Sequence, residues 1–384
     1  MIQCFQIEYK CFSDKDMLKG DDCMKLAILG YGTIGAGVDD LAKQAGLEPT
    51  RVLDLRSVPE GTQTSLQEIL TDPEIEAVVE TMGGLHPAFE YALAALEAGK
   101  HLVTANKLLG SEYGDRLAQA AKEHQVSFRF SAACGGGIPF LPALQDAARF
   151  DRIVRAGGIL NGTTNFMLDR MERFAESYED ALSQAQALGY AERDPSADVD
   201  GLDTMRKCKL ISALAFGVLP EDIPTAGIRS LRASDVSWYR GRKRVCRLTA
   251  CCDGRAAWVE PTLLPESALE ASIRENVNLA WYEGEATGRF AFSGQGAGRY
   301  PTAGNVLRDL MHLAEGSMLG EVRREQANCG ALTRRYYVRM DGECPFPSKR
   351  VGENAWLTEA VAVSAMHQTM KEIPGAFFAA WLEE

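Results

Sequence analysis

The chain has 384 residues and a formal net charge of −12, and 46% of its residues are hydrophobic. This composition is typical of a folded globular protein with two or three domains, because a domain usually spans about one to two hundred residues. The acidic charge argues against nucleic acids and anionic membranes as partners, and no apolar run reaches the roughly 20 residues of a membrane span.

The cysteines, the histidines and the first residues carry little functional signal. The 10 cysteines lack the spacing of a disulfide framework or a zinc site, which predicts free thiols in a reducing cytoplasm. The 5 histidines are scattered, so we expect no metal site. Residues 1–23 have no basic region followed by an apolar core, so they are not a signal peptide, and we expect an N-terminal appendage.

A dinucleotide-binding motif follows the first expected strand. Residues 25–29, KLAIL, form a short apolar run typical of a buried parallel strand. The next six residues, GYGTIG at 30–35, fit the pattern G-x-G-x-x-G, and residues 36–41 can open a helix. A strand before the glycines and a helix after them are the context that distinguishes this motif from an ordinary turn.

Each glycine of the motif has a separate physical role. Gly30 permits a tight turn, Gly32 lets the backbone approach a pyrophosphate, and Gly35 allows close packing of helix on strand. The N-terminus of the helix then faces the negative charge. We therefore expect the cofactor contacts to include the two residues between these glycines, Thr33 and Ile34.

A second strand, at residues 51–55, carries the side chains that could select between the two nicotinamide dinucleotides. Asp54 could accept hydrogen bonds from the ribose hydroxyls of NAD, whereas Arg56 could hold the 2′-phosphate of NADP. Both could also be solvated side chains at a strand end. The residues leave NAD and NADP equally open.

Strands and helices continue to alternate, with strands expected at 76–80, 101–104 and 127–130 and helices at 87–98 and 113–124. This alternation predicts an α/β fold with a Rossmann-type nucleotide-binding domain. Asn106 and Lys107 follow one of these strands at its carboxyl end, the edge where ligands bind in such sheets. We expect Lys107 to face a cofactor or substrate, although a surface lysine is the alternative.

Two further segments suit a crossing between domains and a polar ligand. Residues 133–139, ACGGGIP, contain three glycines and a proline, which break both helix and strand and favour a hinge or a ligand-facing turn. Residues 157–165, GGILNGTTN, are rich in small polar side chains that suit a small polar substrate, although a loop with a helix cap would also explain them.

The segment at 189–207, GYAERDPSADVDGLDTMRK, is the most informative, and a helix is expected from about residue 202 to 216. At roughly 100° per residue, one side of that helix carries Asp203, Lys207, Leu210, Ile211 and Leu214. An exposed i,i+4 ion pair stabilises a helix by only a few tenths of a kcal/mol, about 0.2–0.5. Burial of charge costs several kcal/mol unless each group has a partner, so we expect this pair to line a pocket. A lysine held there by a carboxylate can donate a proton to a developing alkoxide.

These motifs together resemble the homoserine dehydrogenase family over about residues 24–314. The resemblance rests on GYGTIG at 30–35, EAGKHLVTANK at 97–107, GGGIP at 135–139, GILNGTTN at 158–165, GYAERDPSADVDGLDTMRK at 189–207 and GAGRYPTA at 296–303. The family interconverts aspartate 4-semialdehyde and homoserine with NAD or NADP, in the biosynthesis of threonine, methionine and isoleucine. The resemblance implies the same activity here, in the cytoplasm.

The resemblance also assigns roles to particular side chains. Glu192 would bind the substrate's ammonium group with Asp198 nearby, and Asp203 would hold the substrate and orient Lys207, the proton donor. Lys107 would contact the nicotinamide side of the cofactor and the reacting carbonyl. Thr81 would lie near the nicotinamide half.

The chain departs from the family pattern in two places. Many members have a glutamate ahead of the glycine-rich turn and bind a sodium ion there, largely through backbone carbonyls, but Ser131 stands at that position, which argues against sodium. Many members also end in a βαββαβ regulatory module of the ACT type. Residues 321–384 suggest only strands at 335–340, 356–363 and 376–382 with one short helix, which is too little for a full module and leaves control by threonine open.

The expected domains follow from these segments. They are an appendage at 1–23, an NAD(P)-binding domain at 24–134 plus about 301–320, an α+β substrate-binding and dimerisation domain at 135–300, and a truncated ACT-like segment at 321–384. Within the second domain we expect strands at 245–251, 257–264 and 290–292 and a helix near 267–280. By resemblance, the protein forms a homodimer or a higher homo-oligomer, and its partner is a small-molecule substrate.

Three rival functions remain open from sequence. A sugar or inositol dehydrogenase usually has Glu-Lys-Pro where this chain has Asn106-Lys107, which argues against it. A semialdehyde dehydrogenase would need a cysteine nucleophile, for which Cys134 is the candidate, but no base lies near it in sequence. A catalytically silent NADP-binding regulator would not need the lysines and acids at 107, 192, 203 and 207.

Overall fold

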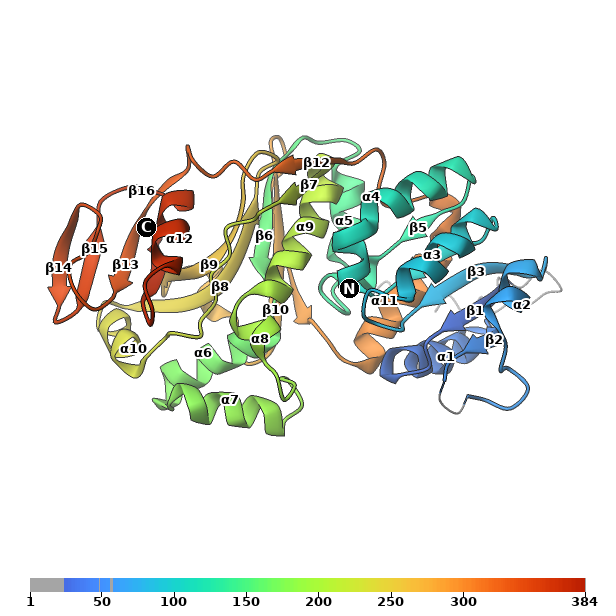
Figure 1. Cartoon of the computed structure of the whole chain (residues 1–384), viewed down its shortest axis with the longest axis horizontal. Coiled ribbons are helices and arrows are strands. Elements are labelled where there is room, and N and C mark those ends of the chain that lie inside the picture. Colours follow the sequence, from blue (N-terminus) through green and yellow to red (C-terminus); the bar gives the residue numbers. More distant parts are fainter. Residues whose placement is uncertain (1–23, 48, 56–57, 384) are drawn as a thin grey trace, which may run out of the picture.

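The computed structural model describes residues 24–47, 49–55 and 58–383. The molecule is elongated, with a parallel sheet at one end and a second, larger sheet that extends from the middle to the other end, where the C-terminal strands lie (Figure 1). The expected appendage at 1–23 and the cofactor candidate Arg56 lie outside the described residues.

The first sheet has five parallel strands in the order β2-β1-β3-β4-β5. The strands are β1 (Lys25–Leu29), β2 (Pro49–Leu53), β3 (Ile75–Glu80), β4 (His101–Thr104) and β5 (Phe128–Arg129). The direction in which strands are added reverses between β1 and β3. In open α/β sheets ligands bind beyond the carboxyl ends of the strands at such a reversal, so this topology places the ligand crevice beside the glycine motif.

Helices cover both faces of the first sheet. One face packs against α1 (Thr33–Ala45) and α11 (Arg299–Met311), which lie side by side although they come from opposite parts of the sequence. The other face carries α2 (Leu66–Thr71), α3 (Ala88–Glu97) and α4 (Lys107–Glu123). The strands are apolar on both faces because both are covered, which explains their continuous apolar runs.

The second sheet has ten strands, nine of them in the order β11-β10-β6-β8-β9-β17-β13-β15-β14, and β16 pairs with β13. Its strands are β6 (Ile153–Ile159), β8 (Arg244–Cys252), β9 (Ala257–Pro265), β10 (Val277–Gly284), β11 (Gly288–Gln295), β13 (Thr333–Arg339), β14 (Ser348–Gly352), β15 (Ala355–Thr358), β16 (Val361–Ala362) and β17 (Phe377–Trp381). β17 joins β9 in parallel, with Ala380 opposite Thr262. The C-terminal strands therefore extend the central sheet and form no separate sheet of their own.

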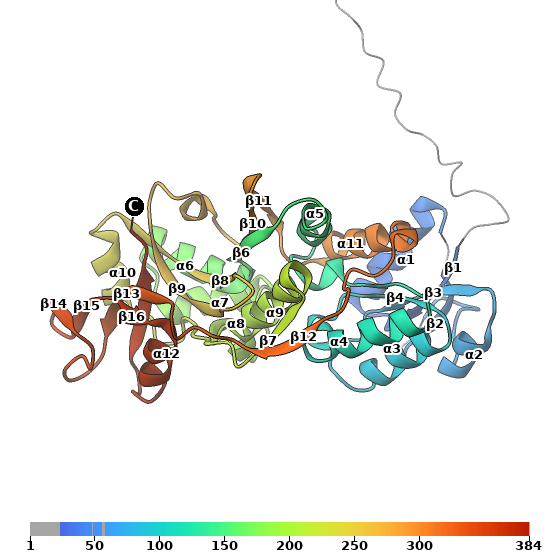
Figure 2. The ribbon, with the colours of Figure 1, turned by 90° about the horizontal axis from the view of Figure 1, so that it is seen from above.

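The helices of the second half position the site. α9 (Leu202–Phe216) packs across β6, β8 and β9, and α6 (Gly162–Phe174) packs across β8 and β10. The shorter helices are α5 (Phe140–Ala147), α7 (Tyr178–Ala187), α8 (Ser196–Val199), α10 (Ala233–Arg240) and α12 (Val363–Lys371). After α11 the chain runs along the molecule through β12 (Arg323–Gln326), which pairs in parallel with β7 (Val218–Glu221) (Figure 2).

Several predicted elements need correction. The helix expected near 267–280 is wrong: residues 269–272 form one 3-10 turn, and 277–284 form the strand β10. Leu279 and Trp281 pack on one face of the sheet while Ala280 and Tyr282 pack on the other. A strand buried on both faces lacks the alternation that identifies strands in a sequence.

Three other boundaries moved. The strand expected at 356–363 divides into β15 and β16, and residue 363 already begins α12, while β14 was missed. The helix expected at 113–124 begins at Lys107, and the strand expected at 51–55 is 49–53. In the part of the chain that the structure describes, every helix is too short or too polar to cross a membrane.

Candidate active site

The helix α9 presents the predicted acid–lysine pair to the interior of the protein. It begins after Gly201, whose φ of 83° is in the left-handed region that favours glycine, and it ends before Gly217 at φ 65°. Asp203 lies in the first turn, where the helix dipole stabilises a carboxylate. The side chains of Asp203 and Lys207 are only 8% and 7% exposed, so the ion pair is buried.

Asp203 joins two lysines from different domains. Its Oδ2 lies 2.8 Å from Lys207 Nζ, and its Oδ1 lies 3.0 Å from Lys107 Nζ. Lys207 Nζ also donates a hydrogen bond of 2.5 Å to the carbonyl of Leu160, at the end of β6. An ammonium group has three hydrogens, so Lys207 keeps one that no described residue accepts.

Asn161 completes the cluster. Its Nδ2 donates to Asp203 Oδ2 at 3.0 Å and to Asp198 Oδ1 at 2.6 Å, while its Oδ1 accepts from the backbone N–H of Thr164 at 2.8 Å. The same side chain therefore caps α6 and fixes two acids. Asn161 was not predicted as a site residue, although it stands in the GILNGTTN motif, because its two partners lie 37 and 42 residues away.

The charges of the cluster support one another. Burial would raise the pKa of Asp203, but the ammonium groups of Lys207 and Lys107 outweigh it and hold that pKa well below its usual range. The carboxylate of Asp203 in turn raises the pKa of Lys107. Burial raises the pKa of Asp198 above its ordinary value. The two ammonium groups therefore favour the ionised form of Asp203.

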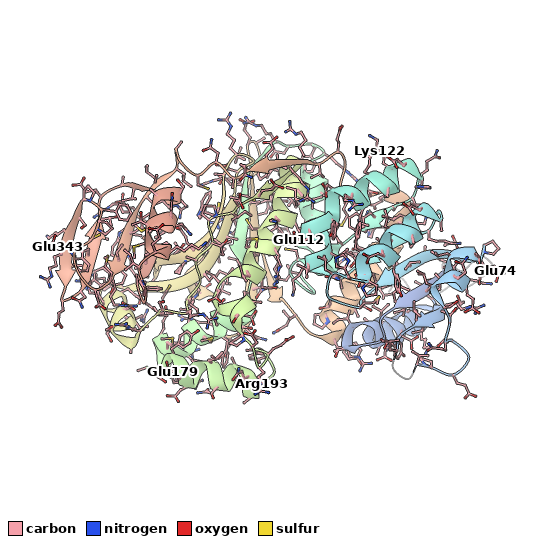
Figure 3. The ribbon with its side chains drawn as sticks, in the orientation of Figure 1. Glu74, Glu112, Lys122, Glu179, Arg193 and Glu343 are labelled. Atoms are coloured by element: carbon pink, nitrogen blue, oxygen red, sulfur yellow. The ribbon has the colours of Figure 1, made fainter. Side chains whose placement is uncertain are left out.

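Lys107 reaches the cluster from the first sheet. It is the first residue of α4, directly after Asn106, whose side chain caps the helix by accepting from the backbone N–H of Leu109 at 3.1 Å. The Lys107 side chain is 44% exposed, so it borders an open space. Glu112, further along α4, lies where α4 meets α9 (Figure 3). Its Oε1 is 3.6 Å from Lys209 Nζ on α9. The two domains therefore meet along α4 and α9.

The predicted ammonium-binding acid Glu192 is not part of the buried cluster. It lies in the loop between α7 and α8 with an exposed side chain, which forms no hydrogen bond or ion pair with another described residue. Its backbone carbonyl accepts from Gln186 Nε2 at 3.0 Å. Glu192 is thus free to meet a ligand from solvent, whereas Asp198 is held in place.

The glycine motif has the geometry of a dinucleotide loop. Gly30 has φ 91°, and a Cβ there would lie 2.7 Å from Met82 Cα; a Cβ on Gly35 would lie 2.0 Å from Gly30 O. Gly32 precedes α1 and offers no side-chain cap, so Thr33 and Ile34 begin a helix whose first N–H groups have no partner within it. Such a helix end binds phosphate, so the loop fits the pyrophosphate of a dinucleotide.

Two predicted residues brace this loop. Thr81, after β3, donates from Oγ1 to the Gly30 carbonyl at 2.6 Å. Asp54, after β2, accepts from the backbone N–H of Tyr31. Beneath them the buried Glu80 accepts from the Thr104 hydroxyl at 2.5 Å and from the Met82 N–H at 2.8 Å, so it ties the ends of β3 and β4 together. Burial raises the pKa of Glu80. Glu80 was not among the predicted site residues.

The alternative nucleophile Cys134 is buried near the cluster, and desolvation raises the pKa of its thiol to about 12. A thiol with that pKa carries almost no thiolate at neutral pH. Among the described residues no group of three or more His, Cys, Asp or Glu side chains is placed to hold a metal ion.

A dinucleotide loop at one domain edge and a buried lysine–carboxylate pair on the facing helix define an oxidoreductase of the nicotinamide-dependent class. Comparison with known proteins narrows the class. Residues 30–131 match the family model "Homoserine dehydrogenase, NAD binding domain", and residues 139–311 match the model "Homoserine dehydrogenase".

Individual proteins agree with the family models. The chain is 39% identical to a homoserine dehydrogenase from Synechocystis over 316 residues, or 76% of this chain and 73% of the relative. It is 35% identical to that of Lactococcus lactis over 353 residues, or 83% and 82%. A crystal structure of a homoserine dehydrogenase from Thiobacillus denitrificans superimposes with a TM-score of 0.81 at 30% identity, covering 94% of this chain and 98% of that one.

The chain belongs to the homoserine dehydrogenase family. Its activity is that of a homoserine dehydrogenase, an NAD(P)-dependent oxidoreductase that acts on a small molecule in amino-acid biosynthesis. A sugar dehydrogenase and a silent regulator are not favoured.

Proposed function

We propose that Lys207 is the group that exchanges a proton with the reacting oxygen when aspartate 4-semialdehyde and homoserine are interconverted. The observation that supports this role is the bridging of Lys107 and Lys207 by one buried carboxylate, that of Asp203. The nicotinamide cofactor, when bound at the glycine loop, supplies or accepts the hydride.

In the reducing direction, negative charge develops on the aldehyde oxygen. The two ammonium groups can stabilise this charge in a partly buried site, and the unshared hydrogen of Lys207 can pass to the oxygen. Asp203 stays ionised because its pKa is depressed, so it orients both lysines without taking the proton. In the oxidising direction Lys207 returns to the ammonium form by accepting the hydroxyl proton.

The substrate's amino-acid end needs a separate contact. We place its ammonium group against Glu192, with Asp198 held beside the cluster by Asn161. Glu192 is exposed in the free protein, which leaves its carboxylate available to an ammonium group arriving from solvent. This division separates recognition of the amino acid from the chemistry at its aldehyde end.

The sequence carries side chains that suit either cofactor. Asp54 at the end of β2 favours NAD through the ribose hydroxyls, and Arg56 favours NADP, so both cofactors belong in the first assay. We place the enzyme in the cytoplasm, as a homodimer or higher homo-oligomer formed through its substrate domain, on the route to threonine, methionine and isoleucine.

The test of the proton role compares two lysines of one helix. Purified protein is assayed for NADPH and NADH formation from L-homoserine, with myo-inositol and glucose as control substrates. Lys207→Ala should lower kcat by about 10²–10⁴, the usual contribution of a general acid or base, and leave the cofactor Kd nearly unchanged. Lys209→Ala, whose ammonium pairs with Glu112 away from the cluster, is the matched control and should remain active.

The results test the proton role of Lys207 and the identity of the substrate separately. Near-normal turnover of Lys207→Ala would refute the proton-exchange assignment while leaving the activity itself intact. Turnover on myo-inositol or glucose by the wild-type protein would instead contradict the substrate.

A further inference from the structure

The glycine-rich turn between the two domains is held by one amide side chain. Asn305, on α11, is 1% exposed, and its Nδ2 donates to the backbone carbonyls of Gly136 and Ile138, the second at 3.1 Å. An amide nitrogen has two hydrogens, so both are used on these two carbonyls. The turn's two inward-facing acceptors are therefore satisfied by a neutral group from another element.

A neighbouring cation fixes the orientation of this amide. Arg308 Nη1 donates to Asn305 Oδ1 at 2.6 Å. Because a guanidinium has only donors, the oxygen of the amide must face Arg308 and the nitrogen must face the turn. The same guanidinium places a positive charge one amide group away from the two carbonyls.

The acid beside the turn is also fully engaged. Asp309 is buried; its Oδ1 and Oδ2 accept from the hydroxyl and the backbone N–H of Ser131, both at 2.6 Å, and Arg129 Nε donates to Oδ1 at 3.2 Å. Arg129 neutralises the charge of Asp309, and both side chains are 1% exposed or less. No unpaired negative charge among these contacts attracts a cation to the turn.

The turn also lies close to the cluster of Asp203 and Lys207. A Cβ on Gly136 would lie 2.6 Å from Gly296 O, and one on Gly137 would lie 2.7 Å from Pro301 Cβ, so the turn fits closely against Gly296 and the first turn of α11. Cys134, at its start, is near enough for the charges of Lys207 and Asp203 to affect it. The turn therefore lies between α11 and the lysine cluster on α9.

We propose that the Asn305 amide occupies the place of a monovalent cation at this turn, so that the enzyme works without sodium. A cation and the amide would compete for the same carbonyl lone pairs, and the buried amide is already present. The residues therefore do not fit the sodium site that the family resemblance suggests. Asn305 is a positioning residue that holds the turn in place of a sodium ion. Removal of the amide should leave acceptors that a sodium ion can use.

The wild-type protein provides the first test. Homoserine oxidation and the thermal unfolding midpoint are measured in NaCl, KCl and choline chloride at equal ionic strength. We expect the rates to agree within about twofold, since no bound cation has to be supplied. A rate that collapses in choline chloride and returns with sodium would overturn the proposal.

Variants test the converse. Asn305→Ala should lose about tenfold in activity in choline chloride, because two buried carbonyls lose their donor, and should regain activity specifically with Na⁺ or K⁺. Its unfolding midpoint should rise with the same cation, as linkage requires for an ion bound only by the folded state. Asn305→Asp, which keeps the shape but replaces the donor with an anionic acceptor, provides a second variant if the alanine protein does not fold.

The control is Asn354→Ala. Asn354 is exposed and lies far from the turn, and its Nδ2 donates to Asp341 Oδ1 at 3.2 Å. The variant should match the wild-type protein in all three salts. Asn305 variants that are equally impaired in sodium, potassium and choline would show an ordinary packing role and refute the cation replacement.

Discussion

Neutralising Asp203 should expose the energetic cost of a buried lysine. In Asp203→Asn the side chain keeps its shape, but the ammonium of Lys207, 7% exposed and 2.8 Å from the lost charge, loses the carboxylate with which it forms an ion pair. With charge centres about 4 Å apart and an effective dielectric of about 20, one such pair is worth about 4 kcal/mol. The contact to the half-exposed Lys107 is screened by water and adds less, about 1 kcal/mol at most.

We therefore expect Asp203→Asn to lower the free energy of unfolding by about 3–5 kcal/mol, the usual cost of an unpaired buried charge. Lys207→Met and the double variant complete a thermodynamic cycle, measured by urea unfolding at neutral pH. The double variant should be more stable than the sum of the single changes implies. The matched control is Asp146→Asn, in the exposed pair of Asp146 (64% exposed) with Arg149 (54% exposed), which should cost about 1 kcal/mol or less. An Asp203→Asn protein as stable as this control, or strict additivity in the cycle, would refute the reasoning.

Three further predictions follow from single contacts. The pKa of Asp203 is lower in the folded state than in the unfolded state, where it is about 3.9. The ionised carboxylate therefore stabilises the fold above that pH, and this stabilisation is lost as the pH falls below about 4. The urea midpoint should fall more steeply below about pH 4 in the wild-type protein than in Asp203→Asn. Gly30→Ala should destabilise by about 1–3 kcal/mol more than Gly61→Ala in thermal unfolding, since both glycines have positive φ but only the first meets Met82. Cys134→Ala should keep most of its homoserine turnover, because the thiol is protonated at neutral pH. A variant that folds and binds the cofactor but is inactive would instead support a nucleophilic role for Cys134.

The sequence allowed prediction of features that depend on short spacing. The glycine motif, the position of Lys107 at a strand end and the i,i+4 pair of Asp203 and Lys207 all depend on neighbours within a few residues. Their chemistry was predictable because local geometry determines which way each side chain faces.

Features that depend on contacts between distant residues were missed. Asn161 meets Asp203 across 42 residues, and Asn305 meets Gly136 across 169, so no local pattern links them. The predicted helix near 267–280 overlaps β10, which is buried on both faces and pairs in antiparallel fashion with β11 and with β6, a strand from a distant part of the sequence. Pairing of this kind overrides local propensity.

The return of α11 to the first sheet has a consequence for how the protein is made. Val306 and Leu310 cover the same face of the sheet as Leu26 and Ile28, yet α11 begins only at residue 299. While the chain is being synthesised, the emerging nucleotide-binding domain must keep the part of this apolar face that α11 covers exposed until the whole substrate domain has left the ribosome. Domains generally fold as units during synthesis, at about 5–20 residues per second. This one can be completed only after the domain that follows it, which makes its exposed face a natural client for chaperones in the meantime.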